Sequence, residues 1–89
     1  MVRMFIHHRV EAYPQWRRGY DAFDEDRRGM GVTDDGVFCA VENSNDVTVI
    51  HDFATADEAR ALAGSARLRE AMSEAGVVGD PEIWVTEQA

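Results

Sequence analysis

The sequence lacks lysine and contains a single cysteine, Cys39. One cysteine excludes a disulfide framework and a cysteine-rich metal site. Nine arginines against 17 acidic residues give a net charge of −8, which argues against a nucleic-acid partner and against anionic membrane surfaces. No apolar run is long enough for a signal peptide or a membrane span, so we expect a cytoplasmic protein without membrane contact.

The chain is also short. Its 89 residues predict one domain, residues 1–89. A domain of this size buries only about 60–65% of the surface that its unfolded chain exposes, so its stability alone is marginal. Oligomerisation is therefore expected.

The hydrophobic pattern predicts alternating strands and helices. Period-two alternation predicts strands, and apolar residues spaced three or four apart predict helices. Thr55–Glu58 has the form of a capping box, which begins a helix. The predicted elements are a strand at 2–10, a helix at 13–28, a strand at 32–42 interrupted by a turn at 34–36, a hairpin turn at 43–46, a strand at 47–54, helical pieces at 55–63 and 65–75, a loop at 77–81 and a strand at 82–86.

This order, β-α-β-β-α-β, predicts an α+β fold. Short connections and right-handed crossovers turn it into a ferredoxin-like antiparallel sheet with two helices on one face. The other face would then carry Phe5, Trp84 and Phe38, an apolar patch too large to leave in water. We expect a homodimer formed through this face, with His7 at the interface and Asp52 paired with Arg9.

Two of the three histidines interrupt apolar strand faces. His51 shares a face with Val47, Val49 and Phe53, and His8 interrupts the apolar face of residues 2–10. An imidazole that is buried and lines a pocket can act as a general acid or base, because its pKa lies near neutrality. The alternative is a core histidine bonded to a backbone carbonyl or to Tyr20. An inverted register would exchange the pair for His7 and Asp52.

An aromatic stripe accompanies these histidines. Trp16 and Tyr20 lie on the apolar face of the first helix, and each has a polar group that needs a partner when buried. They could bind a flat polyphenolic ligand together with Phe53, or they could simply belong to the core. Three scattered histidines show no metal-ligand spacing, and the glycines show no phosphate-loop spacing, so neither a metal nor a cofactor is expected.

Several segments resemble the dimeric α+β-barrel superfamily, in particular its antibiotic-biosynthesis-monooxygenase-like and small polyketide-cyclase-like members. The segments are Phe5–Val10 with Tyr13–Trp16, Asn45–Arg60 and Leu68–Trp84. The resemblance implies a dimeric α+β barrel whose protomers each hold a pocket between sheet and helices. Haem-degrading relatives carry a histidine in the second helical region, whereas residues 56–75 contain none. Where many relatives carry Glu and Trp, this chain has residues 51–53.

The resemblance and the histidine pattern together favour a cofactor-free cyclase acting on a polyketide or polyphenolic intermediate of secondary metabolism. Its base, His51, would deprotonate an activated carbon for aldol cyclisation and dehydration. His8 would be a second catalytic group of the pocket or, as the alternative, a strand-end histidine with a solvated edge. One alternative is a cofactor-independent monooxygenase that oxidises phenols. Another is a non-catalytic dimer that binds a small ligand.

Overall fold

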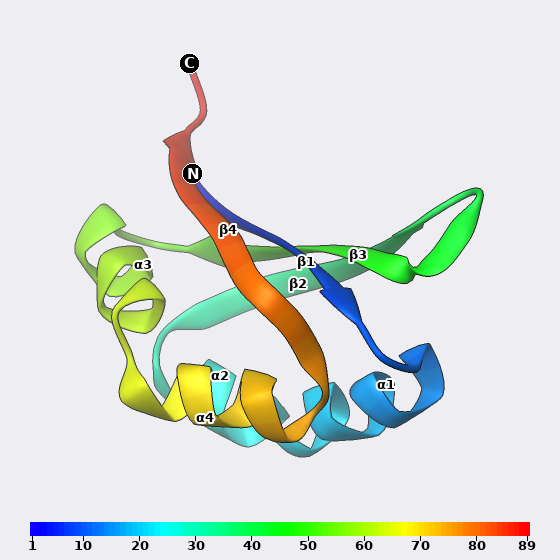
Figure 1. Cartoon of the computed structure of the whole chain (residues 1–89). Coiled ribbons are helices and arrows are strands. Elements are labelled where there is room, and N and C mark those ends of the chain that lie inside the picture. The colour runs from blue at the N-terminus through cyan, green and yellow to red at the C-terminus, as the bar shows by residue number, and fades with distance from the viewer.

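The computed structural model describes residues 1–89, which form one antiparallel sheet covered on one face by helices (Figure 1). The strands are β1 (Val2–Val10), β2 (Val32–Ala40), β3 (Asn43–Phe53) and β4 (Val77–Glu87). The helices are α1 (Tyr13–Ala22), α2 (Asp24–Gly29), α3 (Ala56–Ala63) and α4 (Ala66–Glu74). The sheet order is β2-β3-β1-β4, so the ferredoxin-like α+β prediction is confirmed. None of the helices is long and apolar enough to cross a bilayer.

The buried core lies between the sheet and the helices. Inward-facing residues of β1 alternate with outward-facing ones, and Met4 is completely buried. The capping hydroxyls of Thr55 and Ser65 accept hydrogen bonds from the backbone N–H groups of Glu58 and Leu68, which fixes where α3 and α4 begin. The two chain ends lie side by side, with β1 next to β4 (Figure 1).

The predicted single helix at 13–28 is in fact two helices. The chain leaves helical geometry at Phe23, where α1 ends and α2 follows at once. Buried positions continue at the same spacing on both sides, through Trp16, Tyr20 and Arg27. Hydrophobic periodicity alone therefore could not reveal the break.

Two predicted turns are wrong. Residues 34–36 belong to β2, whose register against β3 shifts between Val32 and Asp34. Gly36 pairs with Ile50 in the ladder, and a Cβ on it would come within 3.1–3.2 Å of the side chains of Ile50 and Phe38. The β2–β3 turn lies at 41–42 rather than 43–46. Asn45 instead belongs to β3, and its Oδ1 accepts a hydrogen bond of 2.9 Å from the backbone N–H of Tyr13.

The predicted loop at 77–81 is also part of a strand. β4 begins at Val77, and the register against β1 shifts between His7 and Arg9. Gly79 has a positive φ of 73° at this irregularity. A bulge in an edge strand tolerates both the glycine and Pro81, which explains why these turn-forming residues did not end the strand.

Candidate functional site

The strand register places His8 and His51 on the helix-covered face of the sheet. His51 pairs with Met4, and His8 pairs with Val47, in the antiparallel β1–β3 ladder. Both imidazoles are buried, at 5% exposure for His8 and 1% for His51. The inverted register, with His7 and Asp52 facing the helices, is excluded. The prediction that both histidines reach the space under the sheet agrees with the structure, whereas their chemical roles stay predictions.

Helix α1 supplies the aromatic wall opposite these strands. Trp16 stacks on Tyr20 with ring centroids 5.0 Å apart, and His8 meets the edge of Trp16 at 5.6 Å. Tyr20 in turn lies 6.2 Å from the His51 ring. A continuous row of four rings therefore connects β1 to β3 across the face of α1.

A small cavity lies along this row, between the sheet and helices α1, α2 and α4. Its volume is about 30 Å³, enough to hold a water molecule. The lining is mainly apolar and consists of Ile6, His8, Trp16, Gly19, Tyr20, Phe23, Arg27, Val49, His51, Leu68, Ala71, Met72 and Ala75. An aromatic ligand requires the surrounding helices to shift.

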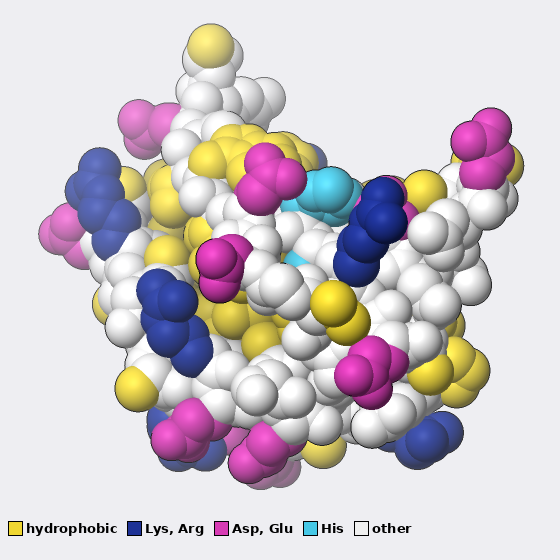
Figure 2. All heavy atoms as spheres, in the orientation of Figure 1, with side chains coloured by type: hydrophobic (Ala, Val, Ile, Leu, Met, Phe, Trp, Pro, Cys, Tyr) yellow, Lys and Arg dark blue, Asp and Glu magenta, His cyan; other side chains and the backbone are white.

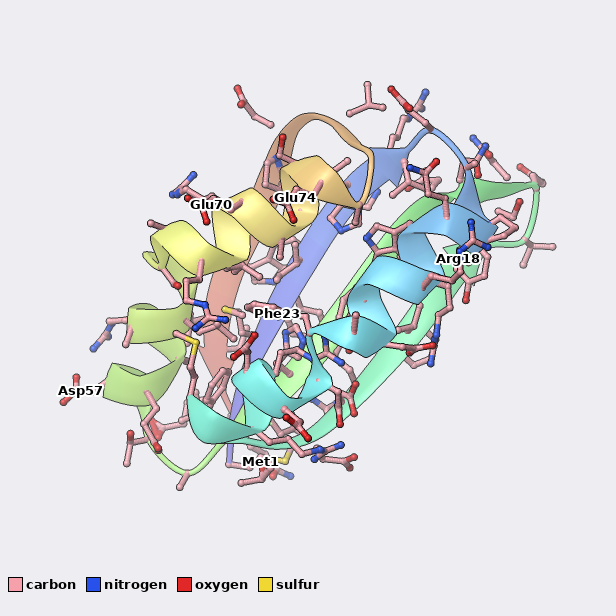
Figure 3. All side chains as sticks on the ribbon, turned by 90° about the horizontal axis from the view of Figure 1, so that it is seen from below. Met1, Arg18, Phe23, Asp57, Glu70 and Glu74 are labelled. Atoms are coloured by element: carbon pink, nitrogen blue, oxygen red, sulfur yellow. The ribbon has the colours of Figure 1, made fainter.

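A wider open groove of about 500 Å³ lies on the outer surface at the α1–α4 seam. It shares Gly19, Phe23, Ala71 and Ala75 with the cavity lining. Figure 3, seen from the helix side, shows Phe23 at this seam between α1–α2 and α4. The shared residues form the wall between the groove and the cavity.

Tyr20 connects His51 to a carboxylate. The Tyr20 hydroxyl donates to Asp35 Oδ2 at 2.5 Å, and the hydroxyl oxygen of Tyr20 lies 3.5 Å from His51 Nε2. Burial, followed by the hydrogen bond to Asp35, raises the pKa of the Tyr20 hydroxyl, so it remains a donor at neutral pH. Its oxygen is then free to accept from His51 Nε2–H. This arrangement favours the tautomer of His51 whose Nδ1 carries no proton.

The environment keeps His51 and His8 neutral. Burial, with a smaller contribution from the charge of Arg27, lowers the pKa of His51 to about 4. Burial likewise lowers the pKa of His8. At neutral pH both imidazoles are uncharged and each has one ring nitrogen with a free lone pair.

Three buried polar atoms at this site have no hydrogen-bond partner in the protein: Nδ1 of His8, Nδ1 of His51 and Nε of Arg27. Native proteins leave few buried polar atoms unsatisfied, and a catalytic or binding role is one of the reasons for an exception. Because all three residues line one cavity, the site has hydrogen-bonding capacity that a ligand could use.

The sequence analysis missed Arg27 and Asp35. Arg27 follows the spacing of the buried aromatic residues, which is the one signal that could have identified it as a buried cation. Asp35 was assigned to a turn. Phe53, expected in the pocket, is 2% exposed but does not line the cavity, because its place on β3 is two residues beyond His51. No cluster of three or more His, Cys, Asp or Glu side chains could hold a metal ion.

The opposite sheet face carries charged pairs around an aromatic pair. Phe5 stacks on Trp84 at 5.2 Å, and Figure 2 shows hydrophobic side chains gathered there, over β4. Asp52 pairs with Arg3 through two hydrogen bonds of 2.7 and 3.0 Å. The predicted partner Arg9 is wrong because the register sets Arg3 directly opposite Asp52.

His7 lies between two carboxylates on that same open face. Its Nε2 is 2.5 Å from Asp46 Oδ1, and its Nδ1 is 3.2 Å from Glu82 Oε1. Hydrogen bonds to these carboxylates, Asp46 first, raise the pKa of His7. The histidine is therefore not part of the cavity and carries more positive charge near neutral pH than an isolated imidazole would.

No family model and no curated protein matches the sequence. Solved structures match over almost the whole chain. A candidate antibiotic biosynthesis monooxygenase from Bordetella bronchiseptica has a TM-score of 0.83 at 13% identity, covering 99% of this chain and 96% of its own. The corresponding candidate from Nitrosomonas europaea has a TM-score of 0.76 at 10% identity, with 99% and 98% coverage.

SnoaB, a cofactor-independent oxygenase from Streptomyces nogalater, has a TM-score of 0.74 at 11% identity, covering 99% of this chain and 94% of its own. At these identities the likeness establishes the fold alone. The resemblance seen in the sequence is confirmed at that level: this chain has the ferredoxin-like α+β fold of the antibiotic biosynthesis monooxygenase structures.

Proposed function

We propose that this protein is a cofactor-free enzyme that deprotonates a phenolic or enolisable aromatic compound and lets the resulting anion react with dioxygen. The observation that carries the proposal is His51, which lines a mainly apolar, aromatic-walled cavity and has a buried Nδ1 without a partner in the protein. The fold shared with SnoaB, named as a cofactor-independent oxygenase, supports the same class of reaction. Other structures of this fold are named as antibiotic biosynthesis monooxygenases, and the sequence resemblance implies a polyketide or polyphenolic substrate, so we propose an aromatic compound of this kind as the substrate class.

His51 would act as the base through Nδ1. The low pKa of His51 keeps that nitrogen unprotonated at neutral pH, but it also makes the imidazole a weak base before the ligand binds. Proton transfer forms an imidazolium next to a ligand anion, and opposite charges attract more strongly in a buried, mainly apolar cavity than in water. The ligand itself therefore raises the basicity of His51 in the complex.

The oxygenation balances without a redox cofactor. The nucleophilic carbon of the anion forms a C–O bond with dioxygen, and the outer oxygen takes up the proton held by His51 to give a hydroperoxide. Loss of the hydrogen that remains on that carbon, with cleavage of the O–O bond, releases water and leaves a C=O group. The substrate loses two hydrogens and gains one oxygen, and dioxygen is reduced to the new carbonyl oxygen and one water.

Cyclisation, which the sequence analysis placed first, begins with the same anion. Because SnoaB shares this fold and is named as a cofactor-independent oxygenase, we rank oxygenation first and cyclisation second.

The assay is a panel of anthrones, naphthols and linear poly-β-ketones incubated with the protein in air and without oxygen. Oxygenation predicts consumption of an aromatic substrate only in air, with one atom of ¹⁸O from ¹⁸O₂ in the product. Turnover that continues without oxygen and releases water would replace the proposal by cyclisation. Binding without any turnover would leave the non-catalytic ligand-binding dimer.

The proposed assembly is a homodimer through the open sheet face. Trp84 is 45% exposed and Phe38 58%, and with the Phe5–Trp84 stack they leave large apolar side chains in water on the isolated chain. A second copy would cover them, because a twofold axis sets one patch against the other. A cytoplasmic location stays a prediction from the sequence.

A further inference from the structure

Arg27 is a buried cation at the cavity wall with little to neutralise it. The residue is 2% exposed, and its guanidinium carbon lies 3.6 Å from the centre of the Tyr20 ring. Its Nη1 donates to the backbone oxygen of Tyr20 at 2.5 Å. That carbonyl satisfies a donor but brings no full negative charge to balance the guanidinium.

The nearby carboxylates compensate Arg27 only in part. Asp24 lies 3.2 Å from Nη2, but its side chain is 44% exposed, so water screens the pair. Asp35 lies 4.0 Å from Nη2 and is shared with Arg28 and with the Tyr20 hydroxyl. A buried charge is costly unless it is paired and hydrogen-bonded. The Nε–H has no acceptor within the protein.

No acidic side chain lines the cavity, and Arg27 is its one permanent charge. Burial favours the neutral forms of His8 and His51 there. The interior is therefore electropositive within a chain whose net charge is −8. A small inorganic anion would leave the aromatic walls without contacts, whereas a planar aromatic oxyanion would satisfy both the walls and the Nε–H donor.

We infer that Arg27 makes the cavity a site for the oxyanion of a phenol or an enol, with Nε–H donating to the deprotonated oxygen and the ring lying along Trp16 and Tyr20. The inference rests on the proposed function, because it names the ionic form of the substrate that the site selects. Arg27 would stabilise the product of proton transfer to His51, so it would favour the anion over the neutral phenol.

The test uses a nitrophenol and a naphthol whose absorption reports their ionisation. The intact protein is titrated with each probe over a range of pH, and the pKa of the bound probe is compared with that of the free probe. Binding the anion about tenfold tighter than the neutral form lowers the bound pKa by about one unit. A bound pKa equal to or above the free value overturns the inference.

Two variants separate Arg27 from charge in general. Arg27→Gln should bind the neutral probe and lose the lowered pKa. Arg17→Gln is the matched control, because Arg17 also lies over the Tyr20 ring, at 5.4 Å, but its side chain is 42% exposed and does not line the cavity. Equal loss in both variants contradicts a specific role of Arg27. If Arg27→Gln does not fold, the measurement on the intact protein still decides.

The location of the probe is followed through the two tryptophans. Trp16 lines the cavity, whereas Trp84 lies on the open sheet face. In NMR spectra the probe should shift the indole N–H signal of Trp16 and leave that of Trp84 in place. Binding with an unchanged pKa removes the inference and leaves the proposed function standing. If no phenol binds near Trp16, both the inference about Arg27 and the proposed function are contradicted.

Discussion

The Tyr20 hydroxyl donates to Asp35 across 2.5 Å, and this bond determines which proton donor and acceptor the cavity offers. Because the hydroxyl hydrogen is committed to the carboxylate, the oxygen can accept from His51 Nε2, 3.5 Å away. The carboxylate of Asp35, the hydroxyl of Tyr20 and the imidazole of His51 are therefore connected in a row through space. A base oriented by a further group is a recurring arrangement in catalytic sites.

Removing the Tyr20 hydroxyl should change the tautomer of His51 and leave the aromatic wall of the cavity in place. Tyr20→Phe keeps the stack on Trp16 but leaves Nε2 of His51 without its partner. We expect the nitrogen NMR shifts of His51 to move away from the form protonated on Nε2, and activity to fall by less than the factor of about 10² to 10⁴ typical of a lost base. Tyr13→Phe, which changes a ring outside the cavity lining, is the control. An unchanged tautomer in Tyr20→Phe would contradict this relationship.

Stability should fall in mild acid because His51 is buried in its neutral form. Its folded-state pKa of about 4 lies below the unfolded value of 6.5, so the unfolded chain binds more protons between these values. The contribution of neutral His51 to the free energy of unfolding is fully present above about pH 6.5 and is lost as the pH falls toward 4. Between pH 7 and pH 5 it amounts to about 2 kcal/mol, at about 1.4 kcal/mol per pKa unit.

Urea denaturation at the two pH values measures this contribution. His51→Gln should lose about 2 kcal/mol less than the unaltered protein between pH 7 and pH 5. His7 and His8 titrate in both proteins, so their effects cancel in the comparison. The same loss in both proteins would show that His51 is already solvated or protonated in the folded state.

The closeness of α1 and α4 should limit substitution at Gly19. A Cβ there would lie 2.8 Å from the Cβ of Ala75, so one helix must move. Gly19→Ala is expected to cost about 1–3 kcal/mol of unfolding free energy, the usual range for overpacking. Gly29→Ala is the matched control, since a Cβ at Gly29 has no neighbour within 4 Å, and it should be neutral or stabilise by up to about 1 kcal/mol. Thermal melts of both variants compare the two positions, and equal stability would contradict the tight seam.

A charge in the aromatic pair should disrupt the proposed dimer. Trp84→Glu removes the ring that stacks on Phe5 and places two like charges near each other across a twofold axis. Sedimentation equilibrium should give a dimer for the unaltered protein and a monomer for the variant. Val41→Glu, at a fully exposed turn position, should remain dimeric. A monomeric unaltered protein at micromolar concentration would refute the assembly.

The strand faces and the cavity histidines could be predicted because strand alternation determines which side chains share a face. The same reasoning failed where glycine and proline served packing or a bulge rather than a turn, as at Gly36 and Pro81. It also missed the cavity charge. The spacing of the buried aromatic residues included Arg27 but did not show that its guanidinium lies over the Tyr20 ring. Asp35 lies on β2, so its hydrogen bond with Tyr20 depends on a tertiary contact that no local pattern encodes.

The rate of His51→Gln under air is the most direct test of the account. Glutamine keeps a polar side chain of similar reach but cannot take up a proton, so the variant should fold, bind the aromatic probe near Trp16 and lose a factor of about 10² to 10⁴ in turnover. His8→Gln should show a smaller loss, and His7→Gln, on the open sheet face, none beyond its effect on the dimer. Normal turnover by folded His51→Gln would contradict the central claim that His51 is the base.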